Sequence, residues 1–91
     1  MPKTSRTVVV GSSVGLHARP ASLFVQAVNA TGHDVSVITA TGESADASSI
    51  LSVLALGVGH GQEIVIEVEG DNAEAVANDL AALLVSDLDA S

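Results

Sequence analysis

The spacing of apolar residues alternates along the chain between two regular periods, and this alternation limits the possible folds more than any other feature. Ile64, Ile66 and Val68 stand at every second position, the period of a strand that buries one face. In residues 21–28, and again from Ala73 onward, apolar side chains recur at spacings of three and four, the period of an amphipathic helix. The chain therefore combines strands and helices that each bury one side.

Four strands and three helices are predicted in the order βαββαβα. The strands are expected over residues 4–10, 34–41, 44–47 and 64–68, and the helices between residues 17 and 32, over residues 50–56, and from Ala73 onward. Strands that leave one face in solvent favour an antiparallel sheet with its helices on the other face. We expect an α+β fold in which a four-stranded antiparallel sheet is covered on one side by three helices.

Local signals mark the helix ends. Pro20 suits a first helical turn, where its missing N–H costs nothing. Ser48 and Ser49 are both candidate N-caps for the short helix, and Asp71 with Glu74 resembles a capping box before the last helix. The segment from residue 87 to the end is expected to fray.

The core must be aliphatic, because Phe24 is the single aromatic residue and there is no cysteine to form a disulfide. Hydrophobic residues make up 47% of the chain, enough for one core, and residues 1–91 are expected to form a single domain. The N-terminal apolar run is too short for a signal peptide, and no stretch approaches the length of a membrane span. A cytoplasmic protein without membrane insertion is expected.

Charge is distributed unevenly. The net charge is −8, and the basic residues are Lys3, Arg6 and Arg19, all near the N-terminus. Nucleic acid is not expected as a ligand, because phosphate neutralisation needs clustered Lys and Arg. The three histidines lack metal-ligand spacing, so neither a metal nor a cofactor is expected. His33 and His60 lie in predicted loops and are expected to be solvent-exposed.

His17 is the residue best placed for chemistry. It stands at the start of a predicted helix, where unpaired N–H groups and the helix dipole favour an anion. A neutral imidazole nitrogen is a good nucleophile toward phosphorus, and the Arg19 guanidinium is suited to binding phosphate oxygens. The same residues fit a plain helix cap beside a surface charge, so the pattern alone leaves both interpretations open.

A resemblance to a known family favours the chemical interpretation. Residues 15–21, GLHARPA, resemble the active-site signature of HPr, the histidine phosphocarrier of the bacterial phosphotransferase system. Ser49-Ile50-Leu51, followed by Leu56-Gly57, resembles the second conserved block of that family. The order of elements and the chain length agree as well, so the resemblance covers essentially the whole chain.

The resemblance implies an open-faced β-sandwich and a role as a stoichiometric carrier of phosphoryl groups, not an enzyme. His17 would accept the group on Nδ1 from phosphorylated enzyme I and pass it to sugar-specific IIA domains. Arg19 matches the arginine that contacts the phosphoryl group. Ser49 matches a serine that an HPr kinase phosphorylates in some bacteria. A monomer is expected.

Some positions depart from the family's pattern. Val14 and Ser48 stand where relatives often carry a polar side chain and a lysine, which weakens one support of the histidine and the case for kinase recognition. Gln26 and Asn29 replace lysines of the first helix. Partner binding should therefore depend mainly on apolar contact. The predicted docking residues are apolar and comprise the neighbour of the histidine and members of the short helix: Ala18, Ile50, Leu51 and Leu54.

Three alternatives are open. A regulatory paralogue in a nitrogen-type signalling branch would use the same chemistry with other partners. A small phosphoryl-hydrolysing enzyme could use His17 and Arg19 but would hold no stable phosphohistidine. A ligand-sensing domain of related layout is a further possibility, although no polar cluster suggests a ligand.

Overall fold

The computed structural model describes residues 3–11, 15–16 and 18–86. Its four strands are β1 (Lys3–Val9), β2 (Asp34–Thr39), β3 (Ser44–Asp46) and β4 (Glu63–Glu69). They form one sheet in the order β1-β4-β2-β3, and every neighbouring pair is antiparallel. The predicted sheet is confirmed, with strand ends that differ from the expected ones by one or two residues.

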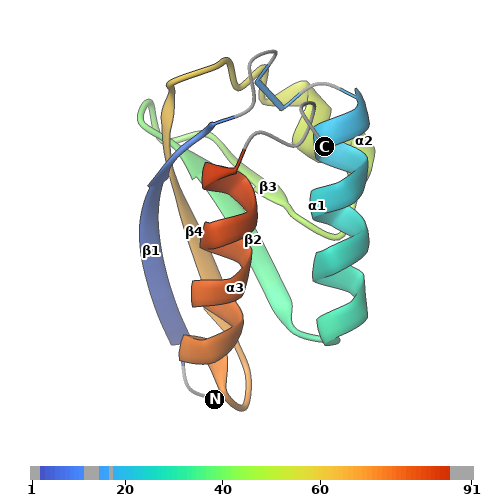
Figure 1. Cartoon of the computed structure of the whole chain (residues 1–91), viewed down its shortest axis with the longest axis vertical. Coiled ribbons are helices and arrows are strands. Elements are labelled where there is room, and N and C mark those ends of the chain that lie inside the picture. The colour runs from blue at the N-terminus through green and yellow to red at the C-terminus, as the bar shows by residue number, and fades with distance from the viewer. Residues whose placement is uncertain (1–2, 12–14, 17, 87–91) are drawn as a thin grey trace.

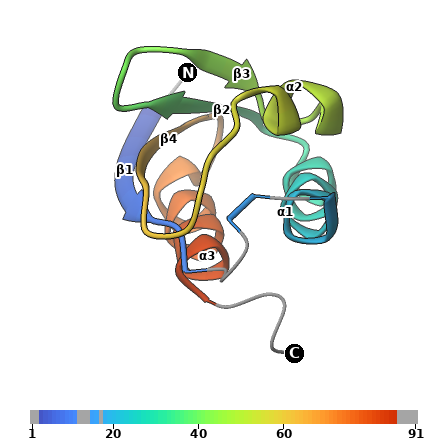
Figure 2. The ribbon, with the colours of Figure 1, turned by 90° about the horizontal axis from the view of Figure 1, so that it is seen from above.

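The helices are α1 (Ala18–Thr31), α2 (Ile50–Ala55) and α3 (Ala73–Val85). Figure 1 shows α1 and α3 side by side in front of the sheet, with α3 over β1 and β4. Seen from above, α2 lies beyond the β3 edge and next to α1 (Figure 2). The helices thus cover one face of the sheet, as expected for an α+β fold with an open second face.

The core fills the space between the sheet and the two long helices. Phe24 is completely buried in α1, and the rest of the core is aliphatic, as the composition requires. Each strand contributes alternate residues, so Ile64, Ile66 and Val68 are at most 1% exposed while their neighbours in β4 retain contact with solvent. The stripe predicted for α3 is largely correct, because Ala73, Ala77, Leu80 and Leu84 are buried.

The predicted start of the last helix is wrong in its detail. The residue that precedes α3 is Asn72, which has a left-handed backbone (φ 61°) and makes no side-chain capping bond. Asp71 lies one residue further back and is exposed, so the expected capping box with Glu74 does not form. Asparagine tolerates the left-handed conformation better than most residues, which lets the chain reverse at this position. The predicted fraying after residue 86 concerns residues outside the described part of the chain.

Gly11 lies at a close approach between the segment after β1 and the end of α3. Its N–H donates to the Leu84 carbonyl at 3.0 Å. A Cβ at this position would lie 1.7 Å from the carbonyl oxygen of Val85, a backbone atom that cannot rotate away as a side chain could. Only glycine permits this packing of the chain against the end of α3.

We therefore predict that Gly11→Ala destabilises the protein, because the added methyl forces the loop away from α3. Overpacking of this kind costs at least about 1–3 kcal/mol. Urea unfolding followed by circular dichroism measures the loss. Gly59→Ala is the matched control, since a Cβ there meets nothing within 4 Å. Equal stabilities of the two variants would show that the contact is not rigid.

Candidate functional site

The N-terminal turn of α1 is where the sequence predicts anion chemistry. Ala18 is the first residue of the helix, and both it and Arg19 are exposed, whereas Pro20 is buried in the first turn. The first turn contains no acidic side chain that would neutralise the positive end of the helix dipole. A helix end of this kind favours a phosphoryl group. His17 itself lies outside the described residues.

The chain that leads into α1 is held against the loop after α2. The Leu16 N–H donates to the Val58 carbonyl at 2.9 Å, and the Leu16 side chain is only 4% exposed. Gly15 has φ +70°, and a Cβ on it would lie 2.4 Å from the Val58 carbonyl oxygen and 2.7 Å from Gly59 Cα. The residues on both sides of position 17 are therefore fixed, by this crossing on one side and by the helix on the other.

A local hydrogen-bond network builds the start of α2. Asp46 accepts from the Ser48 N–H at 2.9 Å and from its hydroxyl at 2.7 Å, and these bonds lower the pKa of the Asp46 carboxyl below its ordinary value. Asn29 of α1 donates to the Ser48 carbonyl at 3.4 Å. Ser49 is then the N-cap, and its hydroxyl accepts from the Ser52 N–H at 3.3 Å. The predicted capping role of Ser49 is confirmed.

The side chains of α2 divide sharply between core and solvent. Val53 is completely buried, while Leu51 is 77% exposed. Ile50 and Leu54 are half-buried and pack against the edge of the core. Leu51 is therefore available to a partner as it stands, whereas Ile50 and Leu54 divide their surface between the core and the solvent.

The predicted site residues gather at one end of the molecule. Packing between α1 and α2 brings Ala18, Arg19 and the α2 residues to the end at which α1 begins (Figure 1). Val58 and Gly59 are not among the residues predicted from the sequence to support this end. The closely spaced glycines at positions 57, 59 and 61 are the one signal that a loop there approaches another backbone.

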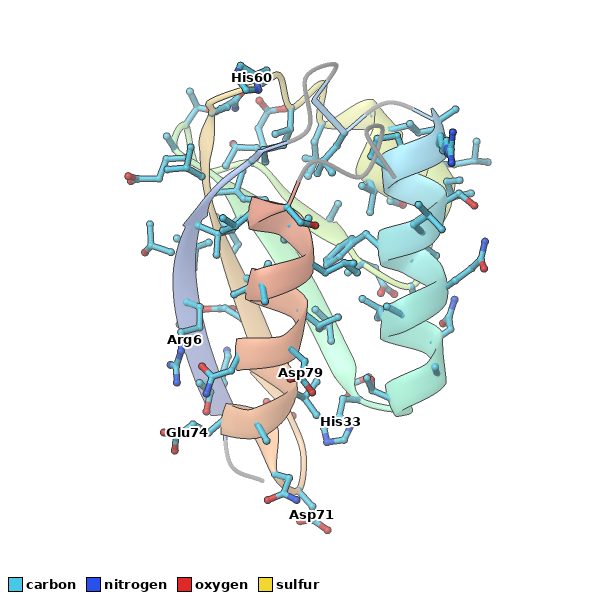
Figure 3. All side chains as sticks on the ribbon, in the orientation of Figure 1. Arg6, His33, His60, Asp71, Glu74 and Asp79 are labelled. Carbon is cyan, nitrogen blue, oxygen red and sulfur yellow. The ribbon has the colours of Figure 1, made fainter. Side chains whose placement is uncertain are left out.

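The two remaining histidines differ from one another. His60 is exposed in the loop before β4, as expected. His33 is in the predicted loop between α1 and β2 and is partly exposed, but it is not a free surface side chain as expected. Both of its ring nitrogens contact backbone carbonyl oxygens. Figure 3 shows His60 at the end where α1 begins and His33 at the opposite end.

Two absences can be stated for the described residues. Within them, no group of three or more His, Cys, Asp and Glu side chains is arranged to hold a metal ion. No helix in the same part of the chain is long and apolar enough to cross a membrane.

Comparison with known proteins gives the family. A family model described as the HPr component phosphorylation site of the phosphotransferase system matches residues 4–86. The phosphocarrier protein HPr of Streptomyces coelicolor is 46% identical over 84 residues, which cover 92% of this chain and 90% of that protein. A crystal structure of the phosphocarrier protein HPr from Bacillus anthracis superposes with a TM-score of 0.85 at 36% identity, covering 90% of this chain and 96% of that one.

A dimer is also among the similar structures. A crystal structure of an HPr dimer from Thermoanaerobacter tengcongensis is similar with a TM-score of 0.67 at 33% identity, covering 84% of this chain and 86% of that one. The monomeric state expected for this chain therefore stays a prediction.

This chain belongs to the HPr family of phosphocarrier proteins, and the predicted HPr-like fold is confirmed. Its role is that of a phosphocarrier in the phosphotransferase system, the system through which sugars are taken up. The carrier interpretation is thus favoured over the hydrolase and the ligand-sensing domain.

The Ser49 cap leads to a prediction on stability. Ser49→Ala should lower the free energy of unfolding by about 0.5–2 kcal/mol, because the Ser52 N–H loses its acceptor. Chemical denaturation measures this loss, and Ser44→Ala on the exposed edge strand β3 is the control. If the two variants are equally stable, the cap contributes nothing measurable.

Proposed function

We propose that His17 is the phosphoryl acceptor, which receives the group on Nδ1 from phosphorylated enzyme I and passes it to sugar-specific IIA domains. The main support is the family match, which spans the run GLHARPA around this residue. The surroundings agree with it, because the flanking Leu16 and Ala18 lie at the dipole-positive end of α1. The protein acts stoichiometrically and without turnover of its own, in the cytoplasm.

The proposed transfer is a displacement at phosphorus. The lone pair of a neutral imidazole nitrogen forms the new N–P bond, and the bond from phosphorus to the donor atom of enzyme I breaks with its electron pair remaining on the donor. Transfer to a IIA domain repeats the displacement with His17 as the leaving group. Because no water takes part, the phosphoryl group is conserved through the relay.

Arg19 is proposed to stabilise the phosphoryl group. It directly follows Ala18 and is exposed at the start of the helix, where its guanidinium can donate to phosphoryl oxygens. The first turn of α1 contains no acidic residue. The positive charge of Arg19 and the positive end of the helix dipole both attract a phosphoryl group.

The proposed docking surface consists of Ala18, Ile50, Leu51 and Leu54. Leu51 is its most exposed member, and the two half-buried residues continue it toward the core. Ser49 caps α2 directly beside it. A phosphate on Ser49, added by an HPr kinase, would place negative charge at this surface and is expected to hinder docking.

The assignment of the acceptor predicts the behaviour of two variants. Incubated with enzyme I and phosphoenolpyruvate, the unaltered protein should gain one acid-labile phosphoryl group, and His17→Ala should gain none. Arg19→Ala should still accept the group, but about ten- to a hundred-fold more slowly, because a charged hydrogen bond contributes about 1.5–3 kcal/mol. Intact mass and rapid-quench kinetics give both results.

Circular dichroism of His17→Ala shows whether the variant is folded, and His60→Ala serves as the matched histidine control. Phosphoryl incorporation by folded His17→Ala at the normal level would contradict the assignment. Loss of incorporation in His60→Ala as well would point to a different acceptor.

The docking proposal predicts that Leu51→Glu weakens binding to enzyme I by at least about tenfold, since it places an unpaired carboxylate in a desolvated contact. Leu54→Glu should also weaken binding, with a loss of stability because its side chain is half-buried. Calorimetric titration against enzyme I measures the affinities. The control is Val9→Glu, whose side chain is 49% exposed on β1 and alternates with the buried Val8. Normal binding by Leu51→Glu would place the docking surface elsewhere.

A further inference from the structure

His33 joins two turns that are far apart in the sequence. It lies between α1 and β2, and its Nδ1 is 2.8 Å from the carbonyl oxygen of Thr31. Its Nε2 contacts the carbonyl oxygen of Asp71, in the turn between β4 and α3. Figure 3 shows the His33 ring directed toward that turn, at the end of the molecule away from the start of α1.

The two partners of the ring are both acceptors. A carbonyl oxygen cannot donate a hydrogen bond, so each ring nitrogen must carry a hydrogen to complete its contact. A neutral imidazole has one N–H and satisfies one of the two carbonyls, whereas the imidazolium satisfies both. The geometry of this site therefore selects the protonated form.

The ring position is fixed by the backbone around it. His33 N–H donates to the Thr31 hydroxyl at 3.1 Å, and that hydroxyl donates to the Val28 carbonyl at 2.7 Å. On the other side the ring lies against Gly70, whose φ is +143° and where a Cβ would lie 2.6 Å from His33 Cδ2. The imidazole is held between these contacts and is not free to turn toward other hydrogen-bond partners.

The charged groups near the ring are mainly acidic. Asp34 of β2, Glu69 of β4 and Asp71 of the following turn line the same shallow hollow as His33. On α3, Asp79 and Glu74 are exposed, and Glu74 pairs with Arg6 of β1 at 3.8 Å. Lys3 of β1 stands opposite Glu69 in the strand register, and its ammonium pairs with Glu67 at 3.4 Å. The carboxylates favour a positive charge on the ring.

We propose that His33 is a protonation-dependent clamp, which in its imidazolium form pins the α1–β2 turn to the start of α3 and releases that turn when it loses its proton. The clamp acts where α3 lacks a side-chain cap, because Asn72 makes no side-chain capping bond to the helix. It ties the C-terminal end of the site-bearing helix α1 to the opposite long helix.

The direction of the pH dependence follows from the same contacts. The hydrogen bond to the Asp71 carbonyl, then that to the Thr31 carbonyl, raise the pKa of His33. Desolvation opposes these two bonds but does not cancel them, and the charges of Asp71 and Asp34 make smaller contributions to the rise. A group whose pKa is higher in the folded than in the unfolded chain contributes its full stabilisation below the unfolded value. That stabilisation is lost as the pH rises through the folded value.

The first test measures His33 directly. Nitrogen-15 NMR of the histidine rings, in the native protein and in the same protein unfolded in urea, should give a higher titration midpoint for His33 in the folded chain. Both ring nitrogens should show bound hydrogen below that midpoint. A folded midpoint equal to or below the unfolded one would overturn the proposal without the need for any variant.

The second test measures what the clamp stabilises. His33→Gln removes the titration, because an amide gains no proton in this range, and His60→Gln is the matched control at an exposed loop histidine. The unaltered protein and His60→Gln should both have a higher free energy of unfolding than His33→Gln. This difference should be larger at about pH 5 than at about pH 9. Hydrogen-exchange protection of the first-turn amides of α3 should fall with rising pH in the first two proteins only. The same pH dependence in all three would refute the clamp.

Discussion

The structure depends above all on the burial of β4 at the centre of the sheet. β4 pairs with β1 along one side and with β2 along the other, so all its neighbours take their register from it. Its inward side chains, Ile64, Ile66 and Val68, lie beneath the helices with almost no exposure. A slip of one residue in β4 would turn these side chains to solvent and place Glu67 in the core. The apolar alternation of this strand therefore fixes the positions of everything packed upon it.

The site is built at one end of this frame by contacts of the main chain. Gly15 and Leu16 cross the backbone at Val58. Ser49 caps the start of α2, and the hydrogen bonds between Asp46 and Ser48 fix the turn before it. These contacts are mainly hydrogen bonds and close approaches of the main chain, and the side chains of Ala18 and Leu51 stay exposed. Exposed apolar side chains suit the proposed role of a carrier that binds a donor and then an acceptor.

The sequence predicts those parts of the fold that depend on local pattern. The period of β4 and the spacing around Phe24 indicate a buried strand and a buried helix face, as the structure has them. Residue type leaves Ser48 and Ser49 as candidate caps of α2, and the structure uses Ser49. Contacts between distant segments could not be predicted in this way. His33 meets a carbonyl 38 residues away, and Asn72 rather than Asp71 precedes α3 because a left-handed turn is needed there. The half-burial of Leu54 likewise depends on how α2 tilts against the core, which its own sequence does not determine.

Both basic residues of β1 are turned toward acids of the same molecule. The Lys3 ammonium lies 3.4 Å from Glu67, and the Arg6 guanidinium lies 3.8 Å from Glu74 while its Nε donates to Asn78 at 3.0 Å. Such exposed pairs add little to stability, but they cancel positive potential that could otherwise act at a distance. The proposed partners would then meet this chain without electrostatic guidance from β1, at roughly 10⁵–10⁶ M⁻¹s⁻¹. With encounters in that range, the rate of transfer would depend on the concentrations of the proposed partners.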